Sequence, residues 1–506
     1  MLSTLFVAAA LAGAPATAAP VSLDRTTVQA SAQTSAPAQS IEDLAQKFGA
    51  ELHAPDYEAA LATAQEIEAH PDFAGWPTQR RRAVILMLGL LNASFEHYEA
   101  ALPWLVQATG WSETDKNVWL TRVEVELHLH DIDAATNTLT TVVRRFPDAL
   151  PEISEDFLLQ RAHARDADPE AAFALRLALY EAGWRNPLAS WVWVSLIDDL
   201  MRHDRADEAV ALVPLVTNPT AQVQLHALKR YDALMAKAGA GEFDIAQAYD
   251  KDLEADRLAA ENTAGDKALD KRNIYISSLL LRGRNEQVLA LADAALAQPE
   301  NKSDVEAAES RTWIMDTRAR ALMALGRRDE ALAQQQAAAA RAEAGQDNVS
   351  QRINLGWLYL RLGRNADALA AVKGIGRDEA SPFGVMQAVQ VRACAAHALG
   401  STELEATAYA YLSEHHKDAP GAWRDALACK GDANGIAALM LEQLADPAQA
   451  DQAVADMHDW ITPTGLTEFD LALERVRAEA RTRPEVVAAH DRVARTFTLP
   501  QVGDVF

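Results

Sequence analysis

An alanine recurs along most of this chain at a nearly constant step. Successive members of the series are separated by 35 to 41 residues, except for one interval of 85 residues in which Val288 occupies the missing place. The series consists of Ala59, Ala100, Ala135, Ala172, Ala209, Ala246, Ala331, Ala368 and Ala406. Self-similarity at a period of about 20–50 residues is typical of stacked structural repeats. The sequence therefore predicts a repeat array, in which each unit contacts mainly its neighbours.

Each repeat has the pattern of two helices joined at a glycine. In the clearest copies, Leu322–Leu332 and Leu360–Leu369, an apolar stretch of helical spacing is followed by a glycine and a second helical stretch. A glycine at the end of the first helix allows a left-handed cap, and the alanine after it allows two antiparallel helices to approach within ~8–10 Å. The joint glycines are Gly241, Gly283, Gly326, Gly363 and Gly400, with Asp204 and Ser94 in their place in weaker copies.

The segment Asn354–Tyr359, together with Gly363 and Ala368, resembles the tetratricopeptide repeat. It carries the Leu-Gly pair of that family, a tyrosine three residues after the glycine, the turn glycine and the small residue of the second helix. The resemblance extends from about Ile41 to Met440, although the units here are longer than the usual repeat of about 34 residues. It implies an all-α fold, an α-solenoid of stacked antiparallel helix pairs, and by itself says little about function.

The period also divides the chain into segments. Residues 41–235 and 272–440 are predicted to form an N-terminal and a C-terminal tetratricopeptide-like array. Residues 236–271 are predicted to hold a longer helix pair and a bend, because the steps to and from Val288 lengthen to 42 and 43 residues. Residues 441–506 have lost the pattern and are predicted to be a helical cap and tail, since a solenoid needs terminal elements with a polar outer face.

Residues 1–18 are predicted to be a cleavable signal peptide. Leu5–Leu11 form an apolar core too short to span a bilayer, and Ala16-Thr17-Ala18 offers a cleavage site after Ala18. The first basic residue is Arg25, so an ordinary apolar N-terminus of a cytosolic protein is the alternative. Residues 19–40 are rich in Ala, Ser, Thr, Gln and Pro and are predicted to be a flexible leader. With no other apolar run of membrane-spanning length, we expect a soluble mature protein that is periplasmic or secreted.

The formal net charge is −25. This excess of carboxylates argues against nucleic acid, which proteins bind with clustered Lys and Arg, and against an anionic membrane surface. Two interpretations remain. The charge serves solubility, or an acidic groove attracts a basic protein or peptide by long-range electrostatics.

The two cysteines, Cys394 and Cys429, are separated by 35 residues, close to one repeat. The register places both on first helices of adjacent units, where residues one repeat apart are spatial neighbours. An exported protein permits a disulfide between them, which would contribute roughly 3 kcal/mol. The alternative is two buried thiols that act as small apolar side chains.

No motif predicts catalysis or metal binding. Glu124 and His128 share a helix face, and His415-His416 lies in a polar segment, but two ligands do not make a zinc site. His397 lies three residues after Cys394, at helical spacing, which is a weak indication of a cysteine nucleophile. We therefore expect no enzymatic activity, no cofactor and no metal.

The family resemblance also implies which residues meet a partner. In tetratricopeptide arrays the first helix of each unit lines the concave face, where Asn and Arg side chains often bind a peptide. Asn354, Trp357 and Arg361 are the strongest set, because they lie on one stripe and combine an aromatic side chain with an arginine, both frequent at binding hot spots. In the alternative, Trp357 packs against the neighbouring unit and Arg361 is solvated. The further candidates by register are Asn273, Ser277, Asp316, Arg320, Gln390, Cys394 and His397.

Together these features predict a non-enzymatic scaffold of the periplasm or cell envelope that binds a peptide or a helix in its concave groove. A periplasmic assembly or maturation chaperone with many transient clients is one alternative. The tetratricopeptide component of an envelope polysaccharide secretion system is a second. A hydrolase with a site that no motif reveals is a third.

Overall fold

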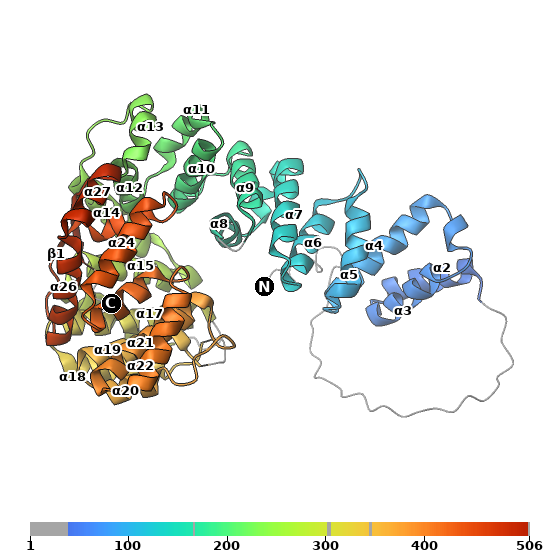
Figure 1. The fold of residues 1–506 in the computed structure, drawn as a ribbon. Helices are drawn as coiled ribbons and strands as arrows, with labels where there is room; N and C mark the ends of the chain where they lie inside the picture. The colour runs from blue at the N-terminus through green and yellow to red at the C-terminus, as the bar shows by residue number, and fades with distance from the viewer. Residues whose placement is uncertain (1–38, 165–166, 301–304, 344–346, 504–506) are drawn as a thin grey trace. The chain divides into compact units, whose positions relative to one another are not determined.

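The computed structural model describes residues 39–164, 167–300, 305–343 and 347–503 (Figure 1). The predicted signal peptide and nearly all of the predicted leader lie outside these residues. Almost all of the described elements are helices, and they pair in chain order as antiparallel neighbours. The predicted all-α, tetratricopeptide-like solenoid is therefore confirmed.

The chain divides into two compact units between Val216 and Thr217, whereas the sequence placed a bend in residues 236–271. Those residues include the 18-residue helix α14, which lies inside the second unit. Unit 1 contains α2 (Ile41–His53), α3 (Tyr57–Glu68), η1 (Phe73–Gly75), α4 (Thr78–Ser94), α5 (Tyr98–Thr109), α6 (Lys116–His128), α7 (Ile132–Arg145), η2 (Pro147–Glu152), α8 (Glu155–His163), α9 (Pro169–Glu181), α10 (Ser190–Arg202), α11 (Ala206–Ala209) and η3 (Val210–Leu215).

Unit 2 begins with helix pairs and ends with three helices and two short strands. Its first part contains α12 (Pro219–Ala227), η4 (Lys229–Tyr231), α13 (Asp232–Lys237), α14 (Ile245–Asn262), η5 (Gly265–Lys267), α15 (Ala268–Leu281), α16 (Asn285–Leu296), α17 (Val305–Ala324), α18 (Arg328–Ala339), α19 (Val349–Arg361), α20 (Asn365–Ala371), α21 (Pro382–Leu399), α22 (Thr402–Glu414), α23 (Pro420–Cys429) and α24 (Ala433–Ala445). Its last part contains α25 (Ala450–Asp456), β1 (Asp459–Ile461), α26 (Glu468–Arg481), α27 (Pro484–Val493) and β2 (Thr498–Val502).

The joint residues adopt the conformation that the sequence predicted for most copies. Gly283, Gly326, Gly363 and Gly400 have φ values of 66–76°, and Asp204 has a φ of 57°. Gly241 does not share this conformation; the left-handed residue near it is Gly239 (φ 66°). A left-handed residue at the end of the first helix ends the helix and reverses the chain, so the repeated turn sets the repeated hairpin.

The recurrent small residue lies between the helices of a pair. It is at most 4% exposed at Ala135, Ala172 and Ala209, and Val288 is fully buried. At the first two copies the register is shifted by one, because Ala60 and Ala101 are the fully buried alanines, one residue after Ala59 and Ala100. Ala331 and Ala368 are also fully buried, whereas Ala246 and Ala406 are exposed.

Gly356, from the Leu-Gly pair of the best repeat, lies at a close helix contact. A Cβ atom at this position would lie 3.0 Å from Val391 Cγ1 and 3.1 Å from Val372 Cγ1. Only a glycine therefore lets α19 approach α20 and α21 without displacing these valines.

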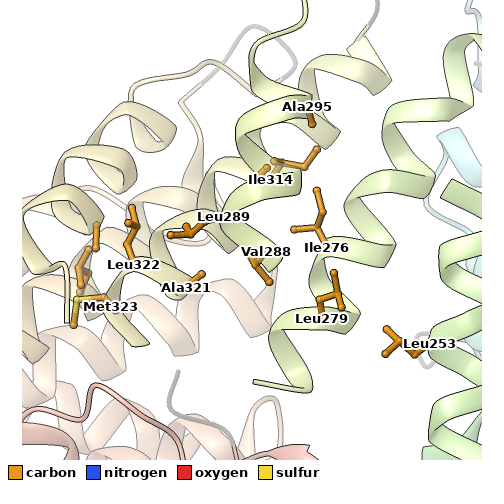
Figure 2. Packing of buried hydrophobic residues seen from close by; sticks show 13 residues of the cluster. Leu253, Ile276, Leu279, Val288, Leu289, Ala295, Ile314, Ala321, Leu322 and Met323 are labelled. Carbon is orange, nitrogen blue, oxygen red and sulfur yellow. The ribbon is translucent and has the colours of Figure 1, made fainter. Parts of the chain in front are cut away.

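The largest described core cluster of unit 2 shows how neighbouring pairs pack. The side chains of Ile276, Leu279 and Val288 point toward one another between adjacent helices, and all three are at most 1% exposed (Figure 2). Ile314 and Leu322 of α17 continue the same cluster (Figure 2). Each such side chain contributes about 1.5–3 kcal/mol when fully buried, so contacts between successive helix pairs hold the array together.

Cys394 and Cys429 are joined by a disulfide, with their Cα atoms 5.3 Å apart. They lie on α21 and α23, the first helices of successive pairs, as the register predicted. The bond fastens two neighbouring pairs of unit 2 to each other.

The C-terminal region is more than the helical cap and tail that the sequence predicted. It includes a parallel pair of short strands, with Asp459 opposite Thr498 and Trp460 opposite Leu499. α26 packs on α19, α23 and α24, while β2 packs on α14 and α15. The sequence did not predict the strands, because three- and five-residue strands carry little periodic signal.

The last residues of unit 2 also bind its first ones. Leu228 and Ala494 form an antiparallel β-bridge. An ion pair of 2.6 Å joins Arg495 Nη2 to Asp232 Oδ2. The helix array of unit 2 is therefore closed by its own C-terminal region.

Candidate functional site: an inner cavity of unit 2

Helix α26 lies on the inner stripe of α19 that the sequence singled out. Trp357 and Phe469 are in contact, with ring centroids 6.3 Å apart. Arg361 donates from Nε to Asp470 Oδ1 at 2.8 Å and from Nη2 to Asp470 Oδ2 at 2.8 Å. Both of these charged side chains are at most 5% exposed, so the pair is a buried two-point contact between the array and the C-terminal region.

Asp470 has a second role at the start of α26. It forms a capping box with Thr467, whose backbone N–H donates to Asp470 Oδ2 at 2.7 Å. The Thr467 hydroxyl accepts in turn from the Asp470 N–H at 3.3 Å. One carboxylate thus begins the helix and attaches it to Arg361.

The expectation that Asn354, Trp357 and Arg361 line an open groove needs correction. These residues face inward, as the register implied, but α26 covers the stripe and leaves Trp357 only 7% exposed. The alternative reading is also incomplete, since Arg361 is paired and buried instead of solvated. The repeat period does not indicate this cover, because the residues of the Arg361–Asp470 pair are 109 positions apart.

Two of the other predicted groove residues, Asp316 and Arg320, form a polar cluster with Asn354 beside this contact. Asp316 is buried, accepts from Arg320 Nε at 2.7 Å, and accepts from Asn354 Nδ2 at 2.9 Å. Arg320 keeps 29% of its side chain exposed. Asn273 lies on α15, half-buried, and its Oδ1 has no hydrogen-bond partner among the described residues.

A cavity of about 860 Å³ remains between the array and the C-terminal region. Three of the predicted groove residues line it: Arg320, Trp357 and Arg361. One wall comes from the ends of α15, α17, α19 and α23, and the other from α24, α25, α26, β1 and β2. The cavity lies entirely within unit 2.

The cavity wall contains a chain of arginine–carboxylate contacts. Asp425 accepts from Arg424 Nε at 2.9 Å and from Arg477 Nη2 at 2.7 Å, and Arg424 also pairs with Asp456. Desolvation acts to raise the pKa of the Asp425 carboxyl, but Arg424 and Arg477 outweigh it and hold that pKa below its usual range. These buried charges are therefore ionised and fixed in position.

His458 adds a neutral group to the same wall. Desolvation, and then the nearby His490, lower the pKa of His458 to about 4. The His458 Nδ1 atom accepts from the Phe497 N–H at 3.2 Å. The ring is therefore uncharged at neutral pH and helps to hold the β1–β2 segment in place.

The sequence did not single out Arg424 and Asp425 on α23, or Trp460 and Arg477 in the C-terminal region, as cavity residues. Arg477 lies on α26, within the residues that are predicted to form the cap. The charged face of that helix was a usable signal, but its partner surface could not be read from the period.

The histidine pairs noted in the sequence have structural partners. His128 stacks on Tyr98, with ring centroids 4.3 Å apart, and lies 4.0 Å from Glu124. His397 Nδ1 lies 3.0 Å from Glu405, and Cys394 has no free thiol because it is in the disulfide. In the described part of the chain, no three His, Cys, Asp or Glu side chains are grouped as metal ligands. Within the same residues, no helix combines the length and the apolar character needed to cross a membrane.

Comparisons with known proteins add little to this picture. No protein-family model matches the chain, and no curated protein matches it significantly. The crystal structure of Rap protein complexed with competence and sporulation factor is 14% identical, with a TM-score of 0.29 over 87% of this chain and 100% of the other.

Two further solved structures are similar at the same level. Naa15/Naa10 bound to HypK-THB is 13% identical, with a TM-score of 0.24 over 89% of this chain and 96% of the other. The APC/C hetero-tetramer Cut9-Hcn1 is 12% identical, with a TM-score of 0.23 over 90% and 96%. Because these TM-scores are low, the fold rests on the helix pairs themselves and the function on the geometry of the chain.

Proposed function

We propose that this protein is a non-enzymatic interaction scaffold of the periplasm or cell envelope, which holds a peptide or helix of a partner against the first helices of its pairs. The observation that carries this proposal is α26 itself. A helix lies on the inner stripe of α19 and is held there by an aromatic contact and a two-point ion pair. The inner face of these helix pairs is thus chemically suited to hold a helix.

Unit 1 offers the corresponding stripe for an external partner. Asn354, Trp357 and Arg361 lie nine, six and two residues before the left-handed turn residue Gly363. In α6 the turn residue is His130, so the same positions are Thr121, Glu124 and His128.

In α4 the left-handed turn residue is Glu96, and the positions are Met87, Leu90 and Ser94. All six side chains on α4 and α6 are partly or fully exposed. These six positions, which we call the α4–α6 stripe, include apolar, hydroxyl, carboxylate and imidazole groups.

The compartment is part of the proposal. A disulfide between Cys394 and Cys429 fits an oxidising environment, and the apolar N-terminus fits export. Fractionation of cells that produce the full chain, followed by N-terminal sequencing of the soluble protein, tests both points. A mature N-terminus at Ala19 is expected, and an uncleaved cytosolic protein would contradict export.

Affinity purification from the native envelope under crosslinking tests the scaffold role. The variant Thr121→Arg/Glu124→Arg changes the charge and size of the α4–α6 stripe. Asn137→Arg/Thr141→Arg on α7 is the matched control, because it adds two arginines on the second helix of the same pair. We expect the stripe variant to capture at least tenfold less partner than the wild type, and the control to capture as much as the wild type.

Circular dichroism should show the same helix content for both variants. Equal capture by the stripe variant and the wild type would overturn the assignment of the stripe. The absence of any partner with the wild-type chain would overturn the scaffold role itself.

The sign of the partner's charge is a separate point. The net charge of the chain favours a basic partner, and Glu124 on the stripe is consistent with one. The α26 contact has the opposite arrangement, because there the array contributes the arginine, Arg361, and the bound helix contributes the carboxylate, Asp470. Capture from wild-type chain at low and at high salt distinguishes a charge-steered partner from an apolar one.

A further inference from the structure

The cavity of unit 2 has chain on two sides and is partly open to solvent. Its C-terminal wall is fixed by the Arg361–Asp470 pair, by the β1–β2 ladder and by the Leu228–Ala494 bridge. A helix with its side chains is about 10–12 Å across, so a volume of about 860 Å³ would hold only a turn or two of one. A volume of about 860 Å³ is instead within the range of roughly 300–1,000 Å³ found for small-molecule sites.

Part of the cavity wall is apolar and uncovered. Leu281 and Ile461 both line the cavity, and they are 48% and 46% exposed. Trp460 lies beside Ile461 on β1, with its indole N–H donated to the Ala455 carbonyl at 3.0 Å. The indole polar group is therefore satisfied, and these side chains present apolar surface to whatever occupies the cavity.

The charged part of the wall is richer in donors than in acceptors. The chain as a whole has 72 acidic and 47 basic residues, yet six arginines and five carboxylates line this cavity, with no lysine. A guanidinium has five N–H donors, and Asp425 is already shared by Arg424 and Arg477. Two further N–H groups, Arg477 Nε and Arg282 Nη1, are buried and have no acceptor among the residues that the structure describes.

The two most exposed arginines of the cavity lining come from opposite walls. Arg320 on α17 has 29% of its side chain exposed, and Arg481 on α26 has 31%. Arg320 pairs with Asp316, and Arg481 pairs with Glu474. Both guanidinium groups are thus held in place while presenting exposed surface.

We propose that this cavity binds a small amphipathic anion, a molecule with an apolar chain and a carboxylate or phosphate head. The apolar chain lies along Leu281, Trp460 and Ile461, and the head meets the guanidinium groups of Arg320 and Arg481. This site belongs to unit 2 and is separate from the scaffold role proposed for the α4–α6 stripe.

Titration of the full mature chain with four probes of equal chain length tests the proposal. Dodecanoate and dodecyl phosphate carry the two anionic heads, while dodecanol and dodecyltrimethylammonium carry a neutral and a cationic head. All are used below their micelle concentrations, with calorimetry and tryptophan fluorescence as readouts, because Trp357 and Trp460 line the cavity. We expect at least one anion to bind tenfold or more tightly than dodecanol, and the cation not to bind. The stronger of the two anions identifies the head group.

Three variants locate the binding. Arg320→Gln and Arg481→Gln should each weaken anion binding about tenfold. Leu281→Glu, at an exposed position, should abolish it by placing a charge on the apolar wall. Arg318→Gln is the matched control, because Arg318 lies on the same helix and pairs with Asp293 at 2.7 Å and with Gln334 at 3.0 Å without lining the cavity.

The outcomes separate clearly. Equal binding of anion, alcohol and cation, or no binding of any probe, overturns the proposal. An equal loss with Arg318→Gln and Arg320→Gln does so as well. Partner capture through unit 1 is measured independently, so the two proposals can fail separately.

Discussion

Replacing Arg361 by methionine should destabilise unit 2 by about 3 kcal/mol. Removing one member of a buried ion pair typically costs about 3–5 kcal/mol, because the other charge is left without its partner. Here the remaining carboxylate of Asp470 is 5% exposed and keeps donors from Thr467. This residual support places the cost at the lower end of the range. For a domain of this size, about 3 kcal/mol corresponds to a fall of roughly 6–12 °C in Tm.

The assay is urea unfolding followed by circular dichroism and tryptophan fluorescence, with the disulfide intact. Arg327→Met is the matched control, since Arg327 pairs with Glu330 on the surface, where the two side chains are 43% and 56% exposed. Exposed pairs contribute about 0–1 kcal/mol, so the free energy of unfolding of Arg327→Met should stay close to that of the wild type.

A double replacement tests the charge argument directly. Arg361→Met with Asp470→Leu removes both charges, which is often close to neutral, and loses the α26 cap at about 1 kcal/mol. The double variant should therefore be more stable than Arg361→Met alone. If Arg361→Met costs no more than Arg327→Met, the pair does not hold α26 in place and the reasoning is refuted.

Three other predictions follow from single residues. Because burial lowers the pKa of His458 to about 4, the unfolded chain binds more protons than the folded one between about pH 6.5 and 4. The contribution of neutral His458 to stability should be complete above pH 6.5 and fall by up to about 3 kcal/mol toward pH 4. His458→Gln should remove this contribution from urea midpoints measured across that window. Desolvation, with Asp256 as the second cause, raises the pKa of Asp252 to about 6. Ionising this carboxyl therefore costs more in the folded chain than in the unfolded one, and stability falls as the pH rises from about 4 to about 6. Asp252→Asn should add about 1–2 kcal/mol at pH 7.5, after allowance for partial solvent screening, and almost nothing at pH 4; an equal gain at both values would contradict the assignment. Gly356→Ala places a Cβ 3.0 Å from Val391 and should cost about 1–3 kcal/mol by overpacking, whereas a neutral effect on Tm would show that α19 and α21 shift freely.

The sequence predicted the features that depend on short-range spacing. The left-handed turns at Gly326 and Gly363 and the buried alanines at Ala331 and Ala368 follow from helical period, because each lies within one hairpin. The same register placed Cys394 and Cys429 on neighbouring first helices, where the structure has them bonded.

The sequence could not predict the cover on the inner face. The contact that holds it, between Arg361 and Asp470, joins residues 109 positions apart, and no period connects them. The inner stripe was located correctly on α19, but its accessibility depended on a segment outside the repeats. For the same reason, the sequence predicts that the cavity arginines of α26 belong to a cap with a polar outer face, and does not indicate that they line a cavity.

The bridge between Leu228 and Ala494 limits how the number of repeats in this protein can change during evolution. In an open array a repeat can be gained or lost at little cost, because the ends are free to move. In unit 2 the two ends are bonded to each other, so an added hairpin would separate them by the rise of one repeat. The number of hairpins in unit 2 is therefore fixed by ring closure, and evolution can vary their surfaces more easily than their count.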